Sequence, residues 1–280
     1  MDFAGKTAAI TGAGSGIGRA LARKLASDGC NLALSDISEE GLAETATLIE
    51  NQHIRYVTSK LDVSNREAVE NWAEATIIEF GGIDLVFNNA GVTVVDNVNS
   101  MTYDDFHWVM NINFWGVVHG SKAFLPHLLG RRQGHLINIS SLFGLVTVPG
   151  QSAYNASKFA VRGFTEALGQ EVRGKGVGVS CVHPGGILTD IAKNARFKRS
   201  FSGKQTAEEF SNTFDALART TPEQAAEVIL DGVVKNKRRI LIGSDARLLD
   251  RLQRLMPVSY GVFLNKVFLL TSKKKAKRVV

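Results

Sequence analysis

The sequence predicts an α/β protein with a parallel, doubly wound sheet of seven strands flanked by helices, and three observations support this prediction. Short apolar segments alternate with helix-like segments from residue 7 to residue 243. A glycine-rich turn separates the first strand from the first helix. The chain has 280 residues, 44% of them hydrophobic, a size that one domain of this class often reaches. We therefore expect a single domain over residues 1–245.

The first four strands are short apolar runs, each bounded by residues that favour turns. They are expected at residues 7–11, 31–35, 55–61 and 83–88. Apolar residues recur at helical spacing in the segments between them. These segments predict helices at residues 16–27, 39–51 and 65–80.

The second half of the chain continues the alternation. Helices are expected at residues 103–129, 152–175 and 222–235, and strands at residues 134–140, 178–183 and 239–243. The last helix begins with a capping-box pattern, in which Thr221 precedes Pro222 and Gln224 follows. Residues 190–218 show no clean pattern, and a segment of this length without one is usually a lid or a binding element.

Composition and charge argue against nucleic-acid binding by the body, a signal peptide and a disulfide. The net charge is +6, but residues 235–280 hold 13 Lys+Arg against 2 Asp+Glu, so the body is mildly acidic. A basic tail on an acidic body does not favour nucleic-acid binding by the body. The N-terminus has an early acid and no apolar run, so it is not expected to be a signal peptide. Cys30 and Cys181 are expected to stay unpaired in a reducing cytoplasm.

The glycine-rich turn at residues 11–18 lies between a strand and a helix. Gly12 permits a tight turn, Gly16 lets the backbone approach a pyrophosphate, and Gly18 lets the helix pack on the sheet. Free N–H groups at the helix N-terminus and the helix dipole favour the phosphates. We therefore predict a dinucleotide site with contacts from Gly12, Ser15, Gly16, Ile17 and Gly18.

Asp36 ends the second strand. A carboxylate there can accept both hydroxyls of the adenosine ribose and would repel a 2′-phosphate. The positions where a basic residue would accept that phosphate hold Ser15 and Ile37, so NAD is expected rather than NADP. Asp62 and Val63 follow the third strand and are expected against the adenine, although an aspartate there could equally cap the next helix.

Tyr154 and Lys158 are four residues apart in a predicted helix, so their side chains share one face. The lysine charge favours the phenolate and is expected to lower the tyrosine pKa from about 10. A phenol tuned in this way can act as a general acid or base. Ser141, thirteen residues before Tyr154, is a neutral donor that could hold the same substrate oxygen.

Together these motifs resemble those of the short-chain dehydrogenase/reductase family. The resemblance covers residues 5–245 and rests on residues 11–18, Asn88, Asn89, Ala90, Gly91, Asn113, Ser141, Tyr154, Lys158, Pro184 and Gly185. It implies a Rossmann-like fold, a nicotinamide cofactor and alcohol/carbonyl chemistry on a small molecule. It also implies assembly into a homodimer or homotetramer through long helix pairs.

The resemblance implies roles for particular residues. Tyr154 would exchange a proton with the substrate oxygen, Ser141 would hold that oxygen, and Lys158 would also bridge the nicotinamide ribose. Asn113 would help to hold a water beside the lysine, with Asn111 as the competing candidate. The remaining implied cofactor contacts are Asn89, Ala90, Gly91, Pro184, Gly185, Ile187 and Thr189.

Other chemistry is not expected from this sequence. The six histidines are scattered without partners at ligand spacing, so no metal site is predicted, and His183 is expected to be structural. The alternative to an enzyme is a non-catalytic nucleotide sensor or scaffold protein on the same fold. The complete set of Ser141, Tyr154 and Lys158 argues against that alternative, because such a protein has no need for a proton relay.

The expected lid at residues 190–218 contains four phenylalanines among basic residues: Phe197, Phe201, Phe210 and Phe214. Phe210 and Phe214 would share a helix face. The aromatic side chains either pack against the body or form an apolar pocket with a basic rim. The second reading suits a bulky secondary alcohol or ketone.

Residues 246–280 form a basic C-terminal extension. An amphipathic helix is expected, with Leu248, Leu249, Leu252 and Leu255 on one side and arginines on the other. The apolar run at residues 258–270 is too short to span a bilayer, and a basic cluster follows at residues 273–278. The extension either packs on a sister subunit or contacts an anionic membrane surface.

Overall fold

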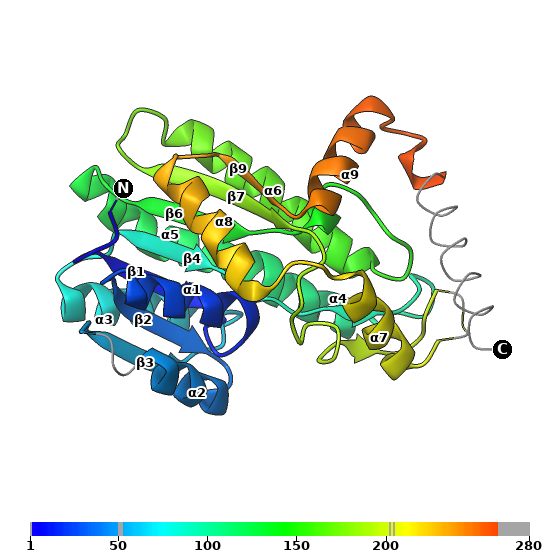
Figure 1. Ribbon diagram of the computed structural model, residues 1–280, viewed down its shortest axis with the longest axis horizontal. Coiled ribbons are helices and arrows are strands. Elements are labelled where there is room, and N and C mark those ends of the chain that lie inside the picture. The colour runs from blue at the N-terminus through cyan, green and yellow to red at the C-terminus, as the bar shows by residue number, and fades with distance from the viewer. Residues whose placement is uncertain (1, 50–52, 202, 204, 263–280) are drawn as a thin grey trace.

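A seven-stranded parallel sheet forms the centre of the molecule, in the strand order β3-β2-β1-β4-β6-β7-β9 (Figure 1). The computed structural model describes residues 2–49, 53–201, 203 and 205–262. The strands are β1 Thr7–Thr11, β2 Asn31–Asp36, β3 Tyr56–Lys60, β4 Leu85–Asn88, β6 His135–Ile139, β7 Gly178–Pro184 and β9 Arg239–Ile242. The predicted doubly wound, Rossmann-like α/β fold is confirmed.

Helices cover both faces of the sheet (Figure 1). One face packs against α1 Gly16–Ser27, α2 Glu39–Ile49 and α8 Pro222–Val234. The other packs against α3 Arg66–Phe80, α5 Gly116–Arg131 and α6 Ser152–Glu171. Successive strand side chains point to opposite faces, so Ile10 belongs to the first core and Ala9 to the second.

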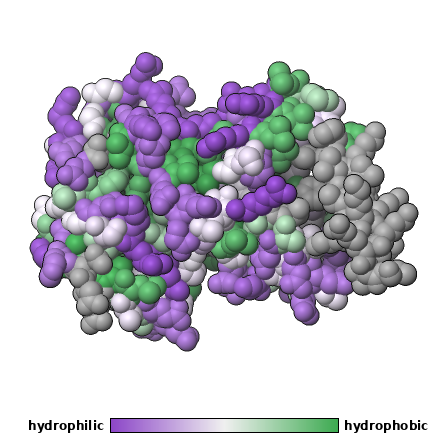
Figure 2. Space-filling view, in the orientation of Figure 1, coloured by the Kyte–Doolittle hydropathy of each residue, from purple (hydrophilic) through white to green (hydrophobic). Residues whose placement is uncertain are grey.

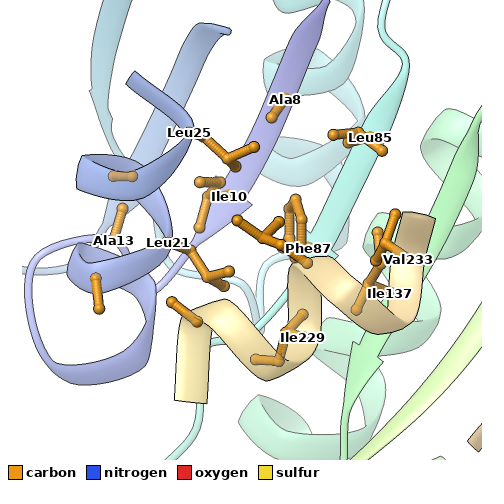
Figure 3. Packing of buried hydrophobic residues seen from close by; sticks show 14 of the residues in the cluster. Ala8, Ile10, Ala13, Leu21, Leu25, Leu85, Phe87, Ile137, Ile229 and Val233 are labelled. Atoms are coloured by element: carbon orange, nitrogen blue, oxygen red, sulfur yellow. The ribbon is translucent and has the colours of Figure 1, made fainter. Parts of the chain in front are cut away.

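The core beneath α1 and α8 fixes the first helix over the sheet. In Figure 3, Leu21 of α1 and Ile229 of α8 point towards Ile10, Phe87 and Ile137 of three neighbouring strands. All five side chains are fully buried, and burial of such a side chain contributes about 1.5–3 kcal/mol. The N-terminus of α1 is thereby held at the carboxyl edge of β1 and β4.

The helix predicted at residues 103–129 is a helical run with an irregularity in its middle. It comprises α4 Tyr103–Met110, a π-helical turn η1 Asn111–Trp115, and α5. A π turn changes the direction in which side chains leave a helix and often occurs at functional sites. Here it carries Asn113.

Residues 190–218 contain regular structure that the sequence analysis did not predict. A short strand, β8 Arg196–Phe197, pairs in parallel with β5 Val94–Val95, and the helix α7 Ala207–Leu217 follows. A capping box begins α7: Thr206 accepts from the Glu209 N–H, and Glu209 accepts from the Thr206 N–H. This Thr-x-x-Glu pattern is visible in the sequence and was sufficient to predict the helix.

The described part of the C-terminal extension contains α9 Ser244–Leu255, as expected. Leu249 packs against the body, whereas Leu248 and Leu255 are exposed. Most of the apolar run at residues 258–270 and the whole basic cluster at residues 273–278 lie outside the described residues. Within the ranges given above, no helix combines the length and apolar character needed to cross a membrane.

The strand order reverses between β1 and β4. In open parallel sheets, ligands bind beyond the carboxyl ends of the strands at such a switch point. The glycine-rich turn follows β1, and residues 89–91 follow β4. The fold therefore brings two of the predicted cofactor-binding segments to the same edge.

Candidate active site

The glycine-rich turn has no room for side chains at two of its predicted positions. Gly12 has a φ of +67°, and a Cβ atom there would lie 2.9 Å from the Ala90 Cα. A Cβ on Gly18 would overlap the Gly12 carbonyl oxygen. These glycines allow the turn to lie close to the segment after β4, and they leave the N-terminus of α1 open. Such an arrangement fits a bound pyrophosphate.

Asn89 ties the segment after β4 to the glycine-rich turn. Its side-chain amide donates to the Thr11 carbonyl (3.0 Å) and the Gly12 carbonyl (3.1 Å). The Thr11 hydroxyl accepts from the N–H groups of Asn89 (3.0 Å) and Ala90 (3.1 Å). The Asn89 side chain thus holds the backbone of the glycine-rich turn in place at the predicted cofactor site.

Asp36 lies beside the turn at the end of β2. Its carboxylate accepts from the Gly14 N–H (2.8 Å) and the Ser38 N–H (3.0 Å). The side chain of Arg19, which also contacts Gly14, is engaged with Thr45 (3.0 Å), Glu44 (2.6 Å) and the Gly14 carbonyl. A carboxylate has about four acceptor positions, so Asp36 keeps capacity for ribose hydroxyls.

Asp62 and Val63 have neighbours of their own in the structure. Asp62 accepts from the Ser64 N–H (2.9 Å) and hydroxyl (2.7 Å), whereas the cap of α3 is Asn65, which accepts from the Ala68 N–H (3.1 Å). Val63 is buried, and its carbonyl faces His119 Nδ1 at 3.1 Å. Asp62 therefore closes a local turn and does not cap the helix.

Tyr154, Lys158 and Ser141 converge at the carboxyl edge of the sheet. Tyr154 and Lys158 lie on one face of α6, with the Lys158 Nζ 5.6 Å from the centre of the tyrosine ring. Ser141 follows β6 and begins the short helical turn η2 Leu142–Gly144. Its hydroxyl accepts from the Phe143 N–H at 3.0 Å and lies close enough to Tyr154 to influence the tyrosine pKa.

Burial is the largest influence on the pKa values of Tyr154 and Lys158. Burial raises the pKa of Tyr154 to about 12, and the neighbouring Ser141 hydroxyl acts in the opposite direction. Burial also lowers the pKa of Lys158 to about 8. The predicted fall in the tyrosine pKa is therefore not found for the chain by itself: the Lys158 ammonium donates to the Ile139 carbonyl at 3.0 Å, and burial of the phenol is the largest influence on its pKa.

Asn113, on the π turn, is fully buried and points into the site. Its amide accepts from the Val92 N–H (2.8 Å) and donates to the Val92 carbonyl (2.9 Å) and the Ser157 hydroxyl (3.0 Å). A Cβ on Gly91 would lie 3.3 Å from the Lys158 Nζ and 3.4 Å from the Asn113 Oδ1. The competing candidate, Asn111, is exposed.

The segment after β7 closes the site opposite the glycine-rich turn. The Gly185 N–H donates to the Ile242 carbonyl (2.9 Å), and Ile187 bridges to Thr220. A Cβ on Gly16 would lie 3.1 Å from the Thr189 methyl group. The two predicted cofactor-binding segments therefore face each other across the end of the sheet.

One residue that holds this segment was missed by the sequence analysis. Asp245, at the start of α9, accepts from the Gly186 N–H at 2.8 Å, and a Cβ on Gly185 would overlap its carboxylate. Asp245 lies 59 positions from Gly186. A long-range contact of this kind has no local sequence pattern.

The segment at residues 190–218 is anchored beside the site. Arg196 donates to Asp105 of α4 at 3.1 Å, and its guanidinium lies 3.7 Å from the centre of the Trp108 ring. Two of the predicted lid phenylalanines are neighbours, with the Phe197 and Phe210 rings 5.9 Å apart, whereas Phe201 is 66% exposed.

Metal ligands and reactive thiols are not part of this geometry. The described part of the chain holds no group of three or more His, Cys, Asp or Glu side chains that could bind a metal ion. Cys30 and Cys181 are free and buried, and burial raises the pKa of each thiol to about 12. A buried thiol of this kind is a poor nucleophile.

Comparison with known proteins identifies relatives along almost the whole chain. A family model described as short chain dehydrogenase matches residues 6–200. The putative oxidoreductase SadH of Mycobacterium tuberculosis is 49% identical over 262 residues, which cover 92% of this chain and 94% of SadH.

Solved structures with the same fold are also found. A short-chain dehydrogenase/reductase from Burkholderia phymatum in complex with NAD has a TM-score of 0.85 and 32% identity, covering 91% of this chain and 95% of that one. Levodione reductase has a TM-score of 0.78 and 29% identity, covering 88% and 99%. The extent of these matches shows that this chain belongs to the short-chain dehydrogenase/reductase family of oxidoreductases.

Proposed function

We propose that the protein transfers a hydride between NAD(H) and the carbinol or carbonyl carbon of a secondary alcohol or ketone. One observation carries this proposal: Tyr154, Ser141 and Lys158 lie together at the carboxyl edge of the sheet. The glycine-rich turn and the segment after β7 at the same edge fit the two ends of a dinucleotide. When bound, the nicotinamide would supply or accept the hydride.

Each residue of the proposed catalytic group has a chemical task. The Ser141 hydroxyl already accepts from the Phe143 N–H, so its own proton can be donated to the substrate oxygen. Tyr154, protonated at neutral pH with its pKa at about 12, would give its proton to a carbonyl in reduction. In oxidation it would take the proton from the hydroxyl.

Lys158 and Asn113 support this exchange. The pKa of Lys158, about 8, keeps most of the lysine charged at neutral pH, so it would favour the phenolate that forms during reduction. Asn113 holds both the N–H and the carbonyl of Val92 through its side-chain amide. It thereby shapes the wall where a water or a ribose hydroxyl would meet the lysine.

Turnover on a panel of secondary alcohols and ketones, with NAD(H) and NADP(H) side by side, tests the proposal. The lid phenylalanines favour bulky, apolar panel members. NAD-dependent turnover of such a compound is expected. NAD binding without turnover of any panel member would favour a nucleotide sensor instead.

Asp36 is proposed to select NAD over NADP, and replacement with alanine tests this. A hydrogen bond to a charged group contributes about 1.5–3 kcal/mol, so Asp36→Ala is expected to raise the KM for NAD by about 10- to 100-fold. The KM for NADP should fall or stay constant, because the repulsion of its 2′-phosphate is removed.

Asp28→Ala is the matched control for this prediction. Asp28 precedes β2, whereas Asp36 ends it, so the two aspartates lie at opposite edges of the sheet. The control should leave both KM values unchanged. An unaltered NAD/NADP ratio in Asp36→Ala would contradict the proposed role.

We also propose assembly into a homodimer or homotetramer through the long helices at residues 103–131 and 152–171. Trp115, on the π turn between α4 and α5, is 47% exposed. A large aromatic side chain that faces solvent in one subunit is suited to an interface.

The C-terminal extension is proposed to contact an anionic membrane surface. Leu248 is 67% exposed and Leu255 82% exposed, and hydrophobic residues are visible over α9 in Figure 2. Exposed arginines at positions 247, 251 and 254 accompany them. Both acids of α9 have partners: Asp245 accepts from the Gly186 N–H, and Asp250 pairs with Arg239 (3.1 Å) and with Arg254 (3.1 Å). Arg247 and Arg251 have no ion pair among the described residues. A surface with this chemistry favours anionic lipid headgroups.

Liposome flotation tests the membrane proposal. The wild-type protein is expected to float with anionic vesicles at low salt and less so at high salt, because salt screens the attraction. Leu248→Glu with Leu255→Glu should reduce retention severalfold. Ile78→Glu on α3, where the side chain is 74% exposed, is the control. Equal retention on neutral vesicles, or none on anionic ones, would contradict the proposal.

A further inference from the structure

His183 contacts the backbone of the proposed catalytic serine. The hydrogen bond from the Ser140 N–H to the Val182 carbonyl (2.8 Å) is the last between β6 and β7. Ser141 follows Ser140, and its carbonyl lies 3.0 Å from the Nδ1 atom of His183. The His183 imidazole therefore links β7 to Ser141, one residue beyond the last backbone hydrogen bond between the two strands.

The contact fixes the protonation of the imidazole. A carbonyl oxygen can only accept, so Nδ1 must carry the proton. The other ring nitrogen, Nε2, is buried and has no hydrogen-bond partner among the described residues. The side chain is fully buried, and burial lowers its pKa to about 4. Among the described residues, the Ser141 carbonyl is therefore the hydrogen-bond partner of this imidazole.

Ser141 is held by contacts with the turn that follows it and with β7. Its hydroxyl accepts from the Phe143 N–H at 3.0 Å, which fixes the side chain relative to the turn that follows. Its backbone is extended, with φ −166° and ψ 166°, and leaves the sheet at this point. Its carbonyl accepts from the Gly144 N–H at 2.9 Å and from His183 Nδ1 at 3.0 Å. Without His183, the carbonyl would keep only the donor from its own turn and would lose its tie to β7.

We propose that His183 is a positioning residue, which holds the Ser141 peptide so that the serine hydroxyl points at the reacting oxygen of the substrate. The inference rests on the proposed function, because it assigns His183 a role only through Ser141. A displacement of about 1 Å at a group that orients substrate can lower the rate about 10²-fold. The effect on cofactor binding should be small.

A second histidine provides a matched control. His135, at the opposite end of β6, is also buried, and burial lowers its pKa to about 4 as well. Its Nε2 contacts the Ser180 hydroxyl at 2.8 Å, far along the strand from Ser141. If both buried histidines had only a structural role, substitutions at His135 and at His183 would have equivalent effects.

The test compares substitutions that keep or remove the donor at Nδ1. The amide nitrogen of asparagine can occupy the place of Nδ1, whereas that of glutamine reaches the place of Nε2. His183→Leu and His183→Gln are expected to lower kcat about 10- to 100-fold, with the Kd for NAD within about threefold of wild type. His183→Asn should recover kcat to within about threefold, and His135→Leu should change thermal stability but not kcat. If His183→Leu does not fold, the comparison of Gln with Asn decides.

A double variant separates positioning from general damage to the site. In a Ser141→Ala background, His183→Leu should cause no further loss of kcat, because the hydroxyl that it positions is absent. An equal loss in both backgrounds would overturn the proposal, and so would a kcat of His183→Asn no better than that of His183→Leu. Failure of the proposed function would appear differently, as wild-type turnover in Ser141→Ala.

Discussion

Tyr154→Phe is expected to lower kcat/KM about 10²- to 10⁴-fold, the range that a positioned acid or base contributes. The variant removes one oxygen atom and keeps the ring, which packs edge-on against Phe143 with 6.1 Å between ring centres. The fold and the glycine-rich turn should be unaffected, so the Kd for NAD should stay within about threefold of wild type. Steady-state kinetics with the best substrate of the panel, together with direct titration of NAD, measure both quantities.

Tyr103→Phe is the matched control for this prediction. Tyr103 begins α4 and is 83% exposed, so loss of its hydroxyl removes a group that is solvated in any case. Its kcat/KM should equal that of the wild type. Turnover by Tyr154→Phe at the wild-type rate would remove the tyrosine from the mechanism, whereas loss of NAD binding would mean that the substitution perturbs the cofactor site.

Features encoded over short stretches of sequence were predictable. The glycine-rich turn and the tyrosine–lysine pair depend on spacings of a few residues, and the resemblance to the family favoured Asn113 over Asn111. In the structure, Asn113 is buried beside Val92 and Asn111 is exposed. The capping box of α7 belongs to the same class, since Thr206 and Glu209 encode it locally.

Features that depend on the folded surroundings could not be predicted. The pKa of Tyr154 is governed by burial, which the four-residue spacing to Lys158 does not reveal. The pairing of β5 with β8 joins residues about a hundred positions apart, and the contacts of Asp245 and His183 also span distant segments. In each case the fold brings distant residues together, and no local sequence pattern identifies the partner.

Buried histidines should make the fold sensitive to mild acid. Burial lowers the pKa of His135 and of His183 from 6.5 to about 4. Between those values the unfolded chain binds protons that the folded protein does not, so the free energy of unfolding falls as the pH falls. The stabilisation is fully present above pH 6.5 and lost as the pH approaches about 4. A difference of this size is worth about 3 kcal/mol for each histidine.

Urea unfolding at intervals between pH 7.5 and pH 4.5 measures this loss and its slope. His135 and His183 should together contribute the uptake of about two protons on unfolding, to which His127 adds because burial also lowers its pKa. His135→Leu should reduce the slope by about one proton. Stability that depends on ionised carboxylates is lost only at a lower pH than this. Burial would raise the pKa of Asp105, but its hydrogen bonds with Arg196 and Thr102 and the charge of Lys198 bring it below the usual 3.8. Constant stability from pH 7 to pH 5 would show that the buried histidines can be protonated without cost to the fold, and it would contradict the neutral state inferred for His183.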